Sequence, residues 1–351
     1  MKKRNFNVCR MFLFVFVILI MGCSKEKTIL DSGQGEATIN ANNINMTVSE
    51  EDICNWIGRY PDDAKIANLT LLGSHDTGAR DMRPICKYFA QCQSYNYKDQ
   101  IRWGARVFDC RLSQNMNFFH GETFCDSNFR LFASACIDFL RENPKEFLIV
   151  LIKAENCDGD GSVFNRKFQE NVDELGRNFF IFEKDLLNQP ISKYRGKMVI
   201  VTRYKEKGKH GYIEGAPQIN WPDQPCFDKT SDANGCISIV LGDRYECESG
   251  TKVVHVKRYF SQISSILTED PTRWCIFFTS GYNLGTVIPA PRPSTYTNEF
   301  RNEKGGLQVL KEHTLYLKKG GTIMFDFVDR WTELRDYIFV HTAPSPKSVS
   351  E

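Results

Sequence analysis

The stretch FLIVLIK, residues 147–153, is apolar at six consecutive positions and ends in a lysine. Consecutive apolar residues indicate a strand that is buried on both faces, as in a parallel sheet covered by helices. Seven further short apolar runs, most of them also consecutive, lie at residues 66–73, 105–112, 116–120, 197–203, 237–243, 274–280 and 322–328. The sequence therefore predicts eight strands.

Helical patterns lie between several of these runs, at residues 127–144, 162–180 and 254–270. In the first pattern, apolar residues recur at helical spacing until Asn143-Pro144 ends the helix. Alternating strands and helices predict an α/β fold, and eight strands in about 300 residues predict a (β/α)8 TIM-type barrel. We assign it to a single domain, residues 51–345. Because no helix fits between Arg111 and Met116, we expect an irregular barrel.

Residues 1–22 resemble a signal peptide, because a basic start is followed by FLFVFVILI, an apolar run too short to span a bilayer comfortably. The run ends in IMGC, which resembles a bacterial lipobox, so we expect cleavage before Cys23 and lipidation of Cys23. An ordinary signal peptide with an incidental cysteine is the alternative. Residues 23–50 are polar and predict a lipidated cysteine with a flexible tether. The expected product is an exported lipoprotein, membrane-anchored through Cys23 on the periplasmic or cell-surface side.

Charge and cysteine content limit the partners and the covalent chemistry. Removal of residues 1–22 takes away four basic residues and no acidic residue, which changes the formal net charge from +2 to −2. Nothing indicates nucleic-acid binding, which would call for a basic patch, and we expect a monomer. An exported chain can form disulfides, and Cys86 with Cys92 and Cys226 with Cys236 are close enough in sequence to pair. The chain has no CxxC zinc pattern.

Ionisable side chains lie at the ends of seven of the eight predicted strands. Each could separately be an ordinary hydrogen-bonding residue. In a barrel, however, the C-terminal ends of all strands converge on one face, which holds the active site, and so many buried charges need partners or a ligand. The residues are His75, Asp76, Asp109, Arg111, His120, Lys153, Glu155, Arg203, Asp243 with Tyr245, and Asp326.

The residue types at these strand ends indicate acid–base chemistry on a phosphate. Two histidines suit a general base and a general acid near neutral pH, and a carboxylate beside an imidazole holds its orientation. An arginine can stabilise charge on a phosphate. The outer set of donors, acceptors and one aromatic ring matches a polyhydroxylated ring. No GxSxG nucleophile motif and no Gly-rich phosphate loop competes for this chemistry.

Several motifs carry these residues, in the order GSHDTG (73–78), QIRWGARVFDCRL (100–112), FFHGETF (118–124), LIKAE (151–155), VTRY (201–204), GDRY (242–245) and MFDF (324–327). From Leu71 to Val328 the chain resembles the metal-independent bacterial phosphatidylinositol-specific phospholipases C. The resemblance implies a phosphorus–oxygen lyase that degrades phosphatidylinositol. The inositol 2-hydroxyl would attack phosphorus, releasing diacylglycerol and 1D-myo-inositol 1,2-cyclic phosphate.

The resemblance also implies a role for each catalytic histidine. His75 would be the general base for the 2-hydroxyl and would pair with Asp326, with Asp329 as the alternative partner. His120 would be the general acid for the diacylglycerol leaving group, assisted by Asp76.

The remaining site residues would bind substrate. Arg111 would bind the phosphate oxygens, with Asp109 in support. The calcium-dependent eukaryotic relatives have an asparagine after the first histidine and acidic ligands on strand two, whereas a guanidinium would occupy the place of the cation here. The resemblance therefore implies neither a metal nor a cofactor. The inositol ring would be held by Lys153, Arg203 and Asp243, and stacked on Tyr245.

Other readings keep part of this scheme. The enzyme could cleave glycosylphosphatidylinositol anchors or another inositol lipid with the same inner residues. A non-catalytic lipid-binding lipoprotein is disfavoured by intact His75 and His120, and a glycerophosphodiesterase would need an acidic metal cluster that Arg111 contradicts. Because the expected substrate lies in a bilayer, two apolar loops are predicted to dock on the membrane. They are residues 82–97 and residues 282–296, the latter with Tyr282, Leu284, Val287, Ile288 and Tyr296.

Overall fold

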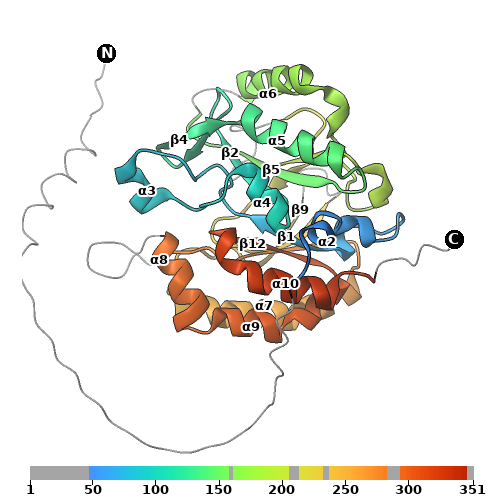
Figure 1. The fold of residues 1–351 in the computed structure, drawn as a ribbon, viewed down its shortest axis with the longest axis vertical. Helices are drawn as coiled ribbons and strands as arrows, with labels where there is room; N and C mark the ends of the chain where they lie inside the picture. Colours follow the sequence, from blue (N-terminus) through green and yellow to red (C-terminus); the bar gives the residue numbers. More distant parts are fainter. Residues whose placement is uncertain (1–46, 158–160, 205–212, 232–236, 283–292, 346–351) are drawn as a thin grey trace, which may run out of the picture. The chain divides into compact units, whose positions relative to one another are not determined.

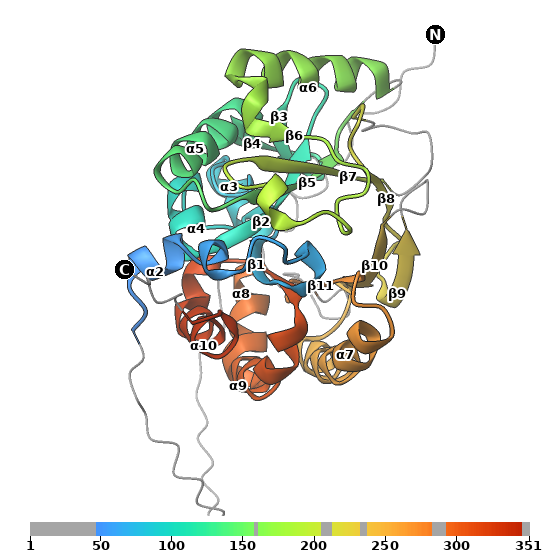
Figure 2. The same cartoon turned by 90° about the vertical axis from the view of Figure 1, so that its right-hand side faces the viewer.

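The structure is a computed structural model that describes residues 47–157, 161–204, 213–231, 237–282 and 293–345. Its central feature is one curled sheet with the strand order β6-β7-β5-β2-β1-β12-β11-β10-β9 (Figures 1 and 2). In that order the strands are Phe180–Ile181, Met198–Tyr204, Leu148–Ala154, Ala105–Leu112, Thr70–Ser74, Gly321–Phe325, Trp274–Phe278, Ser238–Gly242 and Cys226–Ser231.

Neighbouring strands from β6 through β10 are parallel. All five residues of β1, β11 and β12 are buried, as expected for strands with a core on one side and helices on the other. A short strand, β8 (Gln218–Asn220), extends the sheet beside β7. The predicted α/β barrel with an irregular course is therefore confirmed.

The run at residues 116–120 is not a parallel strand of the barrel, contrary to our prediction. It forms β3 (Asn117–His120), which pairs antiparallel with the end of β2 and with β4 (Thr123–Asn128). The physical reason is the short connection after Leu112, because a parallel pairing needs a crossover of a dozen or more residues. The chain instead reverses at Met116, whose φ is +61°, and the Ser113 N–H donates to the Asn117 carbonyl at 2.8 Å.

The three predicted helices are confirmed as α5 (Phe129–Glu142), α6 (Gly161–Leu175) and α7 (Ser249–Glu269). Helix α5 begins after Asn128, whose Oδ1 accepts the Leu131 N–H at 3.1 Å, and it ends at Asn143. The other α-helices in the described part of the chain are α2 (Glu50–Cys54), α3 (Pro84–Ala90), α4 (Tyr97–Trp103), α8 (Pro293–Asn298), α9 (Gly306–Glu312) and α10 (Thr332–Thr342). Among the described residues, no helix has both the length and the apolar character needed to cross a membrane.

A buried ion pair joins the beginning of the described chain to the barrel. Arg106 in β2 donates from Nε to Glu146 Oε2 at 2.6 Å and from Nη2 to the Ile53 carbonyl at 2.7 Å. Glu146 Oε1 in turn accepts the Gly58 N–H at 2.7 Å. Because both charges are paired and hydrogen-bonded, the pair can be buried without an unsatisfied group. It holds α2 and the following turn against the starts of β2 and β5, and so supports the frame that carries the strand ends.

Among the cysteines in the described residues, both Cys86 and Cys92 carry free thiols. The predicted bond between Cys86 and Cys92 is therefore absent. Cys86 lies in α3, whereas the Cys92 thiol is buried and contacts the Ala90 carbonyl at 3.6 Å. Cys226 is also free, and its predicted partner, Cys236, lies outside the described residues.

Candidate active site

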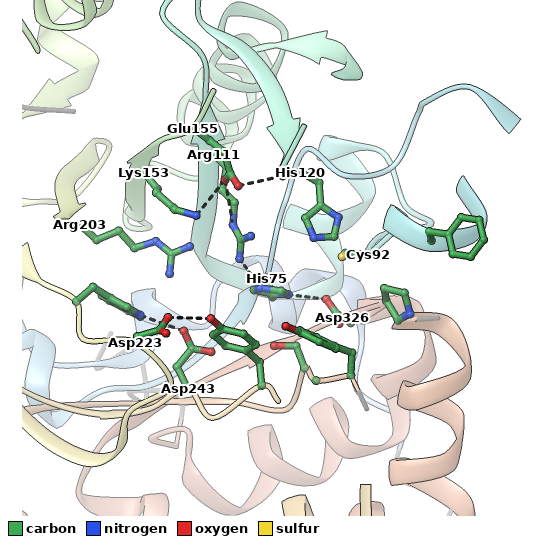
Figure 3. A pocket seen from close by; sticks show the side chains of 18 of the residues that line it. His75, Cys92, Arg111, His120, Lys153, Glu155, Arg203, Asp223, Asp243 and Asp326 are labelled. Carbon is green, nitrogen blue, oxygen red and sulfur yellow. Dashed lines mark hydrogen bonds and ion pairs between the residues drawn. The ribbon is translucent and has the colours of Figure 1, made fainter. Parts of the chain in front are cut away.

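A cavity of about 580 Å³ opens at the C-terminal ends of the strands (Figure 3). Its lining comes from the ends of β1, β2, β3, β5, β7, β10 and β12, so residues far apart in the sequence meet there. Asp76 and Asp109 are buried next to it. All the other predicted catalytic and substrate-binding residues line the cavity: His75, Arg111, His120, Lys153, Arg203, Asp243, Tyr245 and Asp326.

His75 follows β1 directly, and Asp326 follows the neighbouring strand β12. The Nδ1–H of His75 donates to Asp326 Oδ1 at 2.7 Å, so Asp326, not Asp329, is its partner. With Nδ1 protonated, Nε2 has a free electron pair, which accepts a hydrogen bond from Arg111 Nη2 at 2.7 Å. Burial lowers the pKa of His75, but the charge of Asp326 and its hydrogen bond outweigh this effect and raise it above the ordinary value.

Asp76 connects the two halves of the site. Its φ of +46° is unusual for a residue with a side chain, and its N–H donates to Asp109 Oδ2 at 3.3 Å. The carboxylate lies 2.9 Å from Arg111 Nη1 and 3.6 Å from His120 Nε2. A strained backbone therefore places one buried carboxylate between the guanidinium and the second histidine.

His120 reaches the cavity from the β3–β4 hairpin. Its Nδ1–H donates to the carbonyl of Ala90 at 2.7 Å, which fixes the ring so that Nε2 faces Asp76. Arg111 contacts His75 through Nη2 and, through Nη1, the Asp76 carboxylate that lies next to His120, so each histidine has its own acidic neighbour. This arrangement can take a proton on one side of a bound phosphate and deliver one on the other.

The charges around Arg111 hold each other ionised. Asp109 is fully buried, and it forms ion pairs with Arg203 at 2.7 Å and with Arg111 at 3.3 Å. Burial raises the pKa of Asp109, but the two guanidinium groups lower it well below its usual range. Burial likewise opposes the charge of Arg111, yet Asp76, Asp109 and Glu155 raise its pKa. A fixed positive charge therefore stands at the centre of the site.

The wall opposite the histidines is built from donors, acceptors and aromatic rings. The guanidinium of Arg203 lies over the ring of Trp221, 4.8 Å from its centre. The Nε1–H of Trp221 donates to Asp243 Oδ2 at 3.0 Å. The hydroxyl of Tyr245 donates to Asp223 Oδ1 at 2.8 Å, and its ring stacks on that of Tyr282 with 5.7 Å between the centres. Such a wall can hold a ring with several hydroxyl groups.

Glu155 and Trp221 are among the cavity-lining residues that are not predicted as site residues from the sequence. Glu155 lies at a strand end but was not assigned a role; it accepts from Lys153 Nζ at 3.3 Å and from the Gly121 N–H at 2.9 Å. Its position two residues after Lys153 was a usable signal, because the strand ends there. Trp221 follows the three-residue strand β8 in an irregular segment, and the sequence gives no signal for its position.

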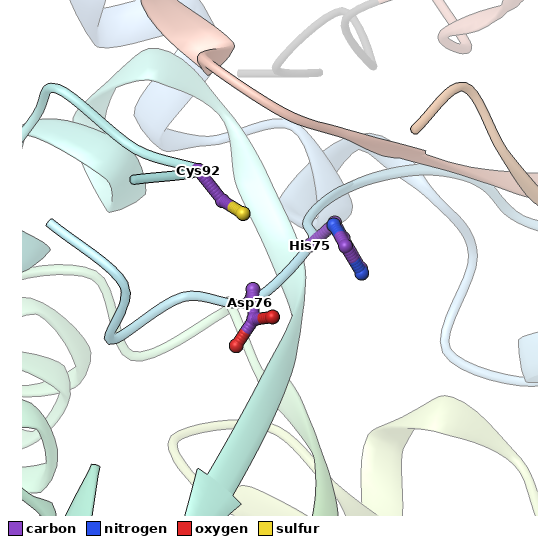
Figure 4. A group of neighbouring side chains, drawn as sticks. All are labelled: His75, Asp76 and Cys92. Carbon is purple, nitrogen blue, oxygen red and sulfur yellow. The ribbon is translucent and has the colours of Figure 1, made fainter. Parts of the chain in front are cut away.

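The ligand atoms of His75, Asp76 and Cys92 lie within 4.8 Å of one another, close enough to be considered as a metal site (Figure 4). Two observations count against this use. Both ring nitrogens of His75 already have partners, and Arg111 lies 2.9 Å from Asp76. A cation added there would face a guanidinium that already neutralises the carboxylate. The donor set thus fits a permanent arginine better than an exchangeable metal ion.

No model of a known protein family matches the chain. In sequence the chain is similar to a curated 1-phosphatidylinositol phosphodiesterase of Staphylococcus aureus, with 25% identity over 227 residues, 62% of this chain and 72% of that protein. It is also similar to the enzyme of the same name from Listeria monocytogenes, with 27% identity over 175 residues, 46% of this chain and 55% of that protein.

Solved structures show the same fold. The phosphatidylinositol-specific phospholipase C of S. aureus matches with a TM-score of 0.66 and 21% identity over 82% of this chain and 98% of that one. The corresponding L. monocytogenes structure matches with a TM-score of 0.60 and 20% identity over the same shares. In sequence and in fold, the chain is therefore a relative of the bacterial phosphatidylinositol-specific phospholipases C.

Proposed function

We propose that the chain cleaves phosphatidylinositol to diacylglycerol and 1D-myo-inositol 1,2-cyclic phosphate, as a phospholipase C that needs no metal. The observation that carries the proposal is the position of Arg111 between two histidines with separate acidic partners, His75 with Asp326 and His120 with Asp76. A phosphate held by Arg111 would have a base on one side and an acid on the other. The names of the curated relatives support the same substrate.

The first proton transfer belongs to His75. Its Nε2 electron pair takes the proton of the inositol 2-hydroxyl, whose oxygen then bonds to phosphorus. The contact between Nε2 and Arg111 at 2.7 Å is given up when the substrate enters. Asp326 stabilises the imidazolium that forms. Because the nucleophile and the phosphorus belong to one molecule, their proximity supplies much of the rate.

The second proton transfer belongs to His120. Its Nε2 donates a proton to the oxygen of diacylglycerol as the bond to phosphorus breaks, and the Asp76 carboxylate lies 3.6 Å from that nitrogen. Arg111 stabilises the negative charge on the phosphate oxygens. Asp109 holds Arg111 in place through the ion pair with its Nε. Lys153, Arg203 and Asp243 bind inositol hydroxyls, and Tyr245 packs against the ring.

The face that carries the cavity also suits contact with a lipid surface. In α3, Ile85 is 71% exposed and Phe89, which lines the cavity, is 50% exposed. These apolar side chains would enter the bilayer beside the substrate. In the second predicted docking loop, Tyr296 is buried, and Leu284, Val287 and Ile288 lie outside the described residues. We further propose a monomer, held at the membrane through lipidated Cys23 and a tether within residues 23–50.

The decisive test is incubation of the purified protein with phosphatidylinositol vesicles, with and without excess chelator. We expect inositol 1,2-cyclic phosphate and diacylglycerol in equal amounts under both conditions. Detection of inositol 1-phosphate as the first product, or no product at all, would contradict the proposal. Parallel incubation with a glycosylphosphatidylinositol-anchored protein tests whether a substituted inositol is accepted.

A further inference from the structure

We propose that Gln93 is a positioning residue that holds Asp326 against His75. Gln93 lies in the segment that follows α3, and its side chain is 0% exposed. It is not among the residues that line the cavity, and the hydrogen bonds of its side chain go to backbone groups. Its amide group instead lies across the C-terminal ends of β1 and β12, where the histidine and its acidic partner leave the sheet. This inference deepens the proposed function and rests on it for its kinetic part.

The amide group of Gln93 is fully used in this position. Nε2 donates one hydrogen to the carbonyl of His75 at 2.7 Å and the other to the carbonyl of Phe325 at 2.9 Å. Oε1 accepts the N–H of Val328 at 3.2 Å. The partners fix the orientation of the amide, because only its nitrogen can donate to two carbonyls. One side chain is thereby hydrogen-bonded to the C-terminal ends of both β1 and β12, next to His75 and Asp326.

Residues 92–93 form hydrogen bonds with three residues close to Asp326 in the sequence, namely Phe325, Phe327 and Val328. Gln93 holds Phe325 and Val328 on either side, and the carbonyl of Cys92 accepts the Phe327 N–H at 2.7 Å. The turn needs such support because Phe327 has a φ of +49°, a region that residues with side chains rarely adopt. A strained turn persists only where the surroundings determine it from several sides. Without the amide, the turn can relax and carry the Asp326 carboxylate away from Nδ1 of His75.

The pKa of His75 should depend on whether Gln93 holds the turn that carries Asp326. The charged groups facing its ring are Asp326 from the turn after β12, Arg111 and Asp109 from β2, and Asp76 from its own loop, and the Cys92 thiol lies beside it. Of these charged groups, only Asp326 lies in the turn that Gln93 holds. Loss of the amide should therefore weaken the contact with Asp326, which raises the pKa of His75 more than Asp76 does, and leave the other contacts in place.

The test compares Gln93→Met with Thr322→Val. Methionine keeps the volume of glutamine and removes the three hydrogen bonds of its amide group, to His75, Phe325 and Val328. Thr322 is a matched control, because it is buried in the same strand β12 and its Oγ1 accepts the Trp274 Nε1–H at 2.8 Å, away from the turn. Both variants lose a buried hydrogen bond and should unfold more easily. The titration of His75 is followed by NMR, with His75→Gln to assign its signal, and kcat and KM are measured on phosphatidylinositol.

In Gln93→Met we expect a lower pKa of His75, a shift of the acidic limb of the pH–rate profile to lower pH, and a kcat reduced up to about 10²-fold with KM unchanged. Thr322→Val should keep the wild-type titration and kcat. Should Gln93→Met fail to fold, Gln93→Asn, which keeps an amide but shortens it, is measured in the same way. A wild-type titration of His75 in a folded Gln93 variant, or an equal shift in Thr322→Val, would overturn the inference. If the wild type does not cleave phosphatidylinositol, the proposed function fails, and the titration still decides the role of Gln93.

Discussion

The two histidines of the site have different supports, which suits them to different tasks. His75 donates to a carboxylate, whereas His120 donates to a backbone carbonyl. A carboxylate partner makes the opposite ring nitrogen a stronger base. A carbonyl partner fixes the ring without adding a full charge at that side, and the Asp76 carboxylate lies 3.6 Å from Nε2 on the other side. These partners support the proposed roles of His75 as base and His120 as acid.

Replacing either histidine by alanine should lower turnover of phosphatidylinositol by about 10² or more, because each positioned proton transfer contributes roughly 10²–10⁴-fold. His341→Ala is the control, since His341 lies in α10 and bonds to the carbonyl of Tyr337, remote from the cavity. The variants are compared by initial rates on vesicles after circular dichroism has established folding. Near-normal rates for folded His75→Ala or His120→Ala would show that the roles are wrongly assigned.

Asp326→Asn should move the pH dependence as well as the rate. The negative charge of Asp326 raises the pKa of His75, and a base must be unprotonated to act. Without that charge the pKa falls, so the acidic limb of kcat/KM against pH should shift to lower pH, while the plateau drops up to about 10²-fold as the ring loses its orientation. Asp329→Asn should leave the limb in place. A shift caused by Asp329→Asn alone would contradict the pairing.

Metal independence is a prediction about Arg111. Activity should be the same in excess chelator, and Arg111→Asp, which removes the positive charge between the histidines, should be nearly inactive. The measurement is product formation with chelator, and then with added calcium. Loss of wild-type activity in chelator with recovery in calcium would refute the argument from Arg111.

The sequence predicts which side chains line the cavity wherever the end of a parallel strand decides their position. The parallel strands β1, β2, β5, β7, β10 and β12 carry their polar residues at the C-terminal end, and the barrel brings these ends together whatever their order. The choice between Asp326 and Asp329 could not be made from sequence, because it depends on the turn at Phe327, whose backbone is left-handed. Gln93 and Trp221 act through contacts across the fold that have no local pattern.

Among the secondary-structure elements, the β3–β4 hairpin is the main departure from a regular barrel, and it carries His120. One lateral support comes from Glu155, whose Oε1 accepts the Gly121 N–H at 2.9 Å, next to the histidine. Burial raises the pKa of Glu155, but Arg111 and Lys153 lower it below its usual value. The carboxylate is therefore charged and ties the hairpin to the barrel strands.

Glu155→Ala should loosen the hairpin and reduce kcat up to about 10²-fold, because small displacements of a reacting group are costly. Glu155→Gln keeps an oxygen that can accept the Gly121 N–H and removes the charge, so the difference between the two variants isolates the hydrogen bond. Glu122→Ala, an exposed change in the same hairpin, is the control. Rates on phosphatidylinositol are measured for all three. Equal losses in Glu155→Ala and Glu155→Gln would assign the effect to charge, against our expectation.

Three strands that the sequence does not predict are short or weakly apolar. Strand β9 has the sequence CFDKTS, with only two apolar residues, and strands β6 and β8 have two and three residues. Their existence depends on pairing with β10 and β7 and not on their own composition. The direction of β3 could have been inferred, because four residues between two strands allow only an antiparallel return.

At the level of the whole molecule, the two ends of the barrel differ in what they offer to a membrane. Ile85 in α3 lies on the side of the cavity and is 71% exposed. Leu315, in the turn η6 (Thr314–Lys319) that precedes β12, lies at the opposite strand ends and is 61% exposed. The two residues have similar exposure and bulk, so they form a matched pair for testing which end meets lipid.

Ile85→Ser should weaken binding to phosphatidylinositol vesicles by up to about 1.5–3 kcal/mol, the value of a fully buried side chain, and should slow cleavage in bilayers accordingly. Leu315→Ser should change neither. Hydrolysis of soluble inositol 1,2-cyclic phosphate should be unaffected by both changes, because the cavity is intact. Binding is measured by vesicle sedimentation, and rates are measured on the vesicle substrate and on the soluble substrate. Equal losses on the soluble and the vesicle substrate would mean that Ile85 supports the fold.

The buried thiols of the barrel bear on the conditions in which the chain can fold. Burial raises the pKa of the thiols of Cys92, Cys110 and Cys136 well above the ordinary value, so they stay protonated at neutral pH and are poor partners in thiol–disulfide exchange. The described barrel requires no oxidant to reach its native state. Folding of the described barrel is therefore compatible with a reducing as well as an oxidising environment, and mispaired disulfides are avoided once the core has closed.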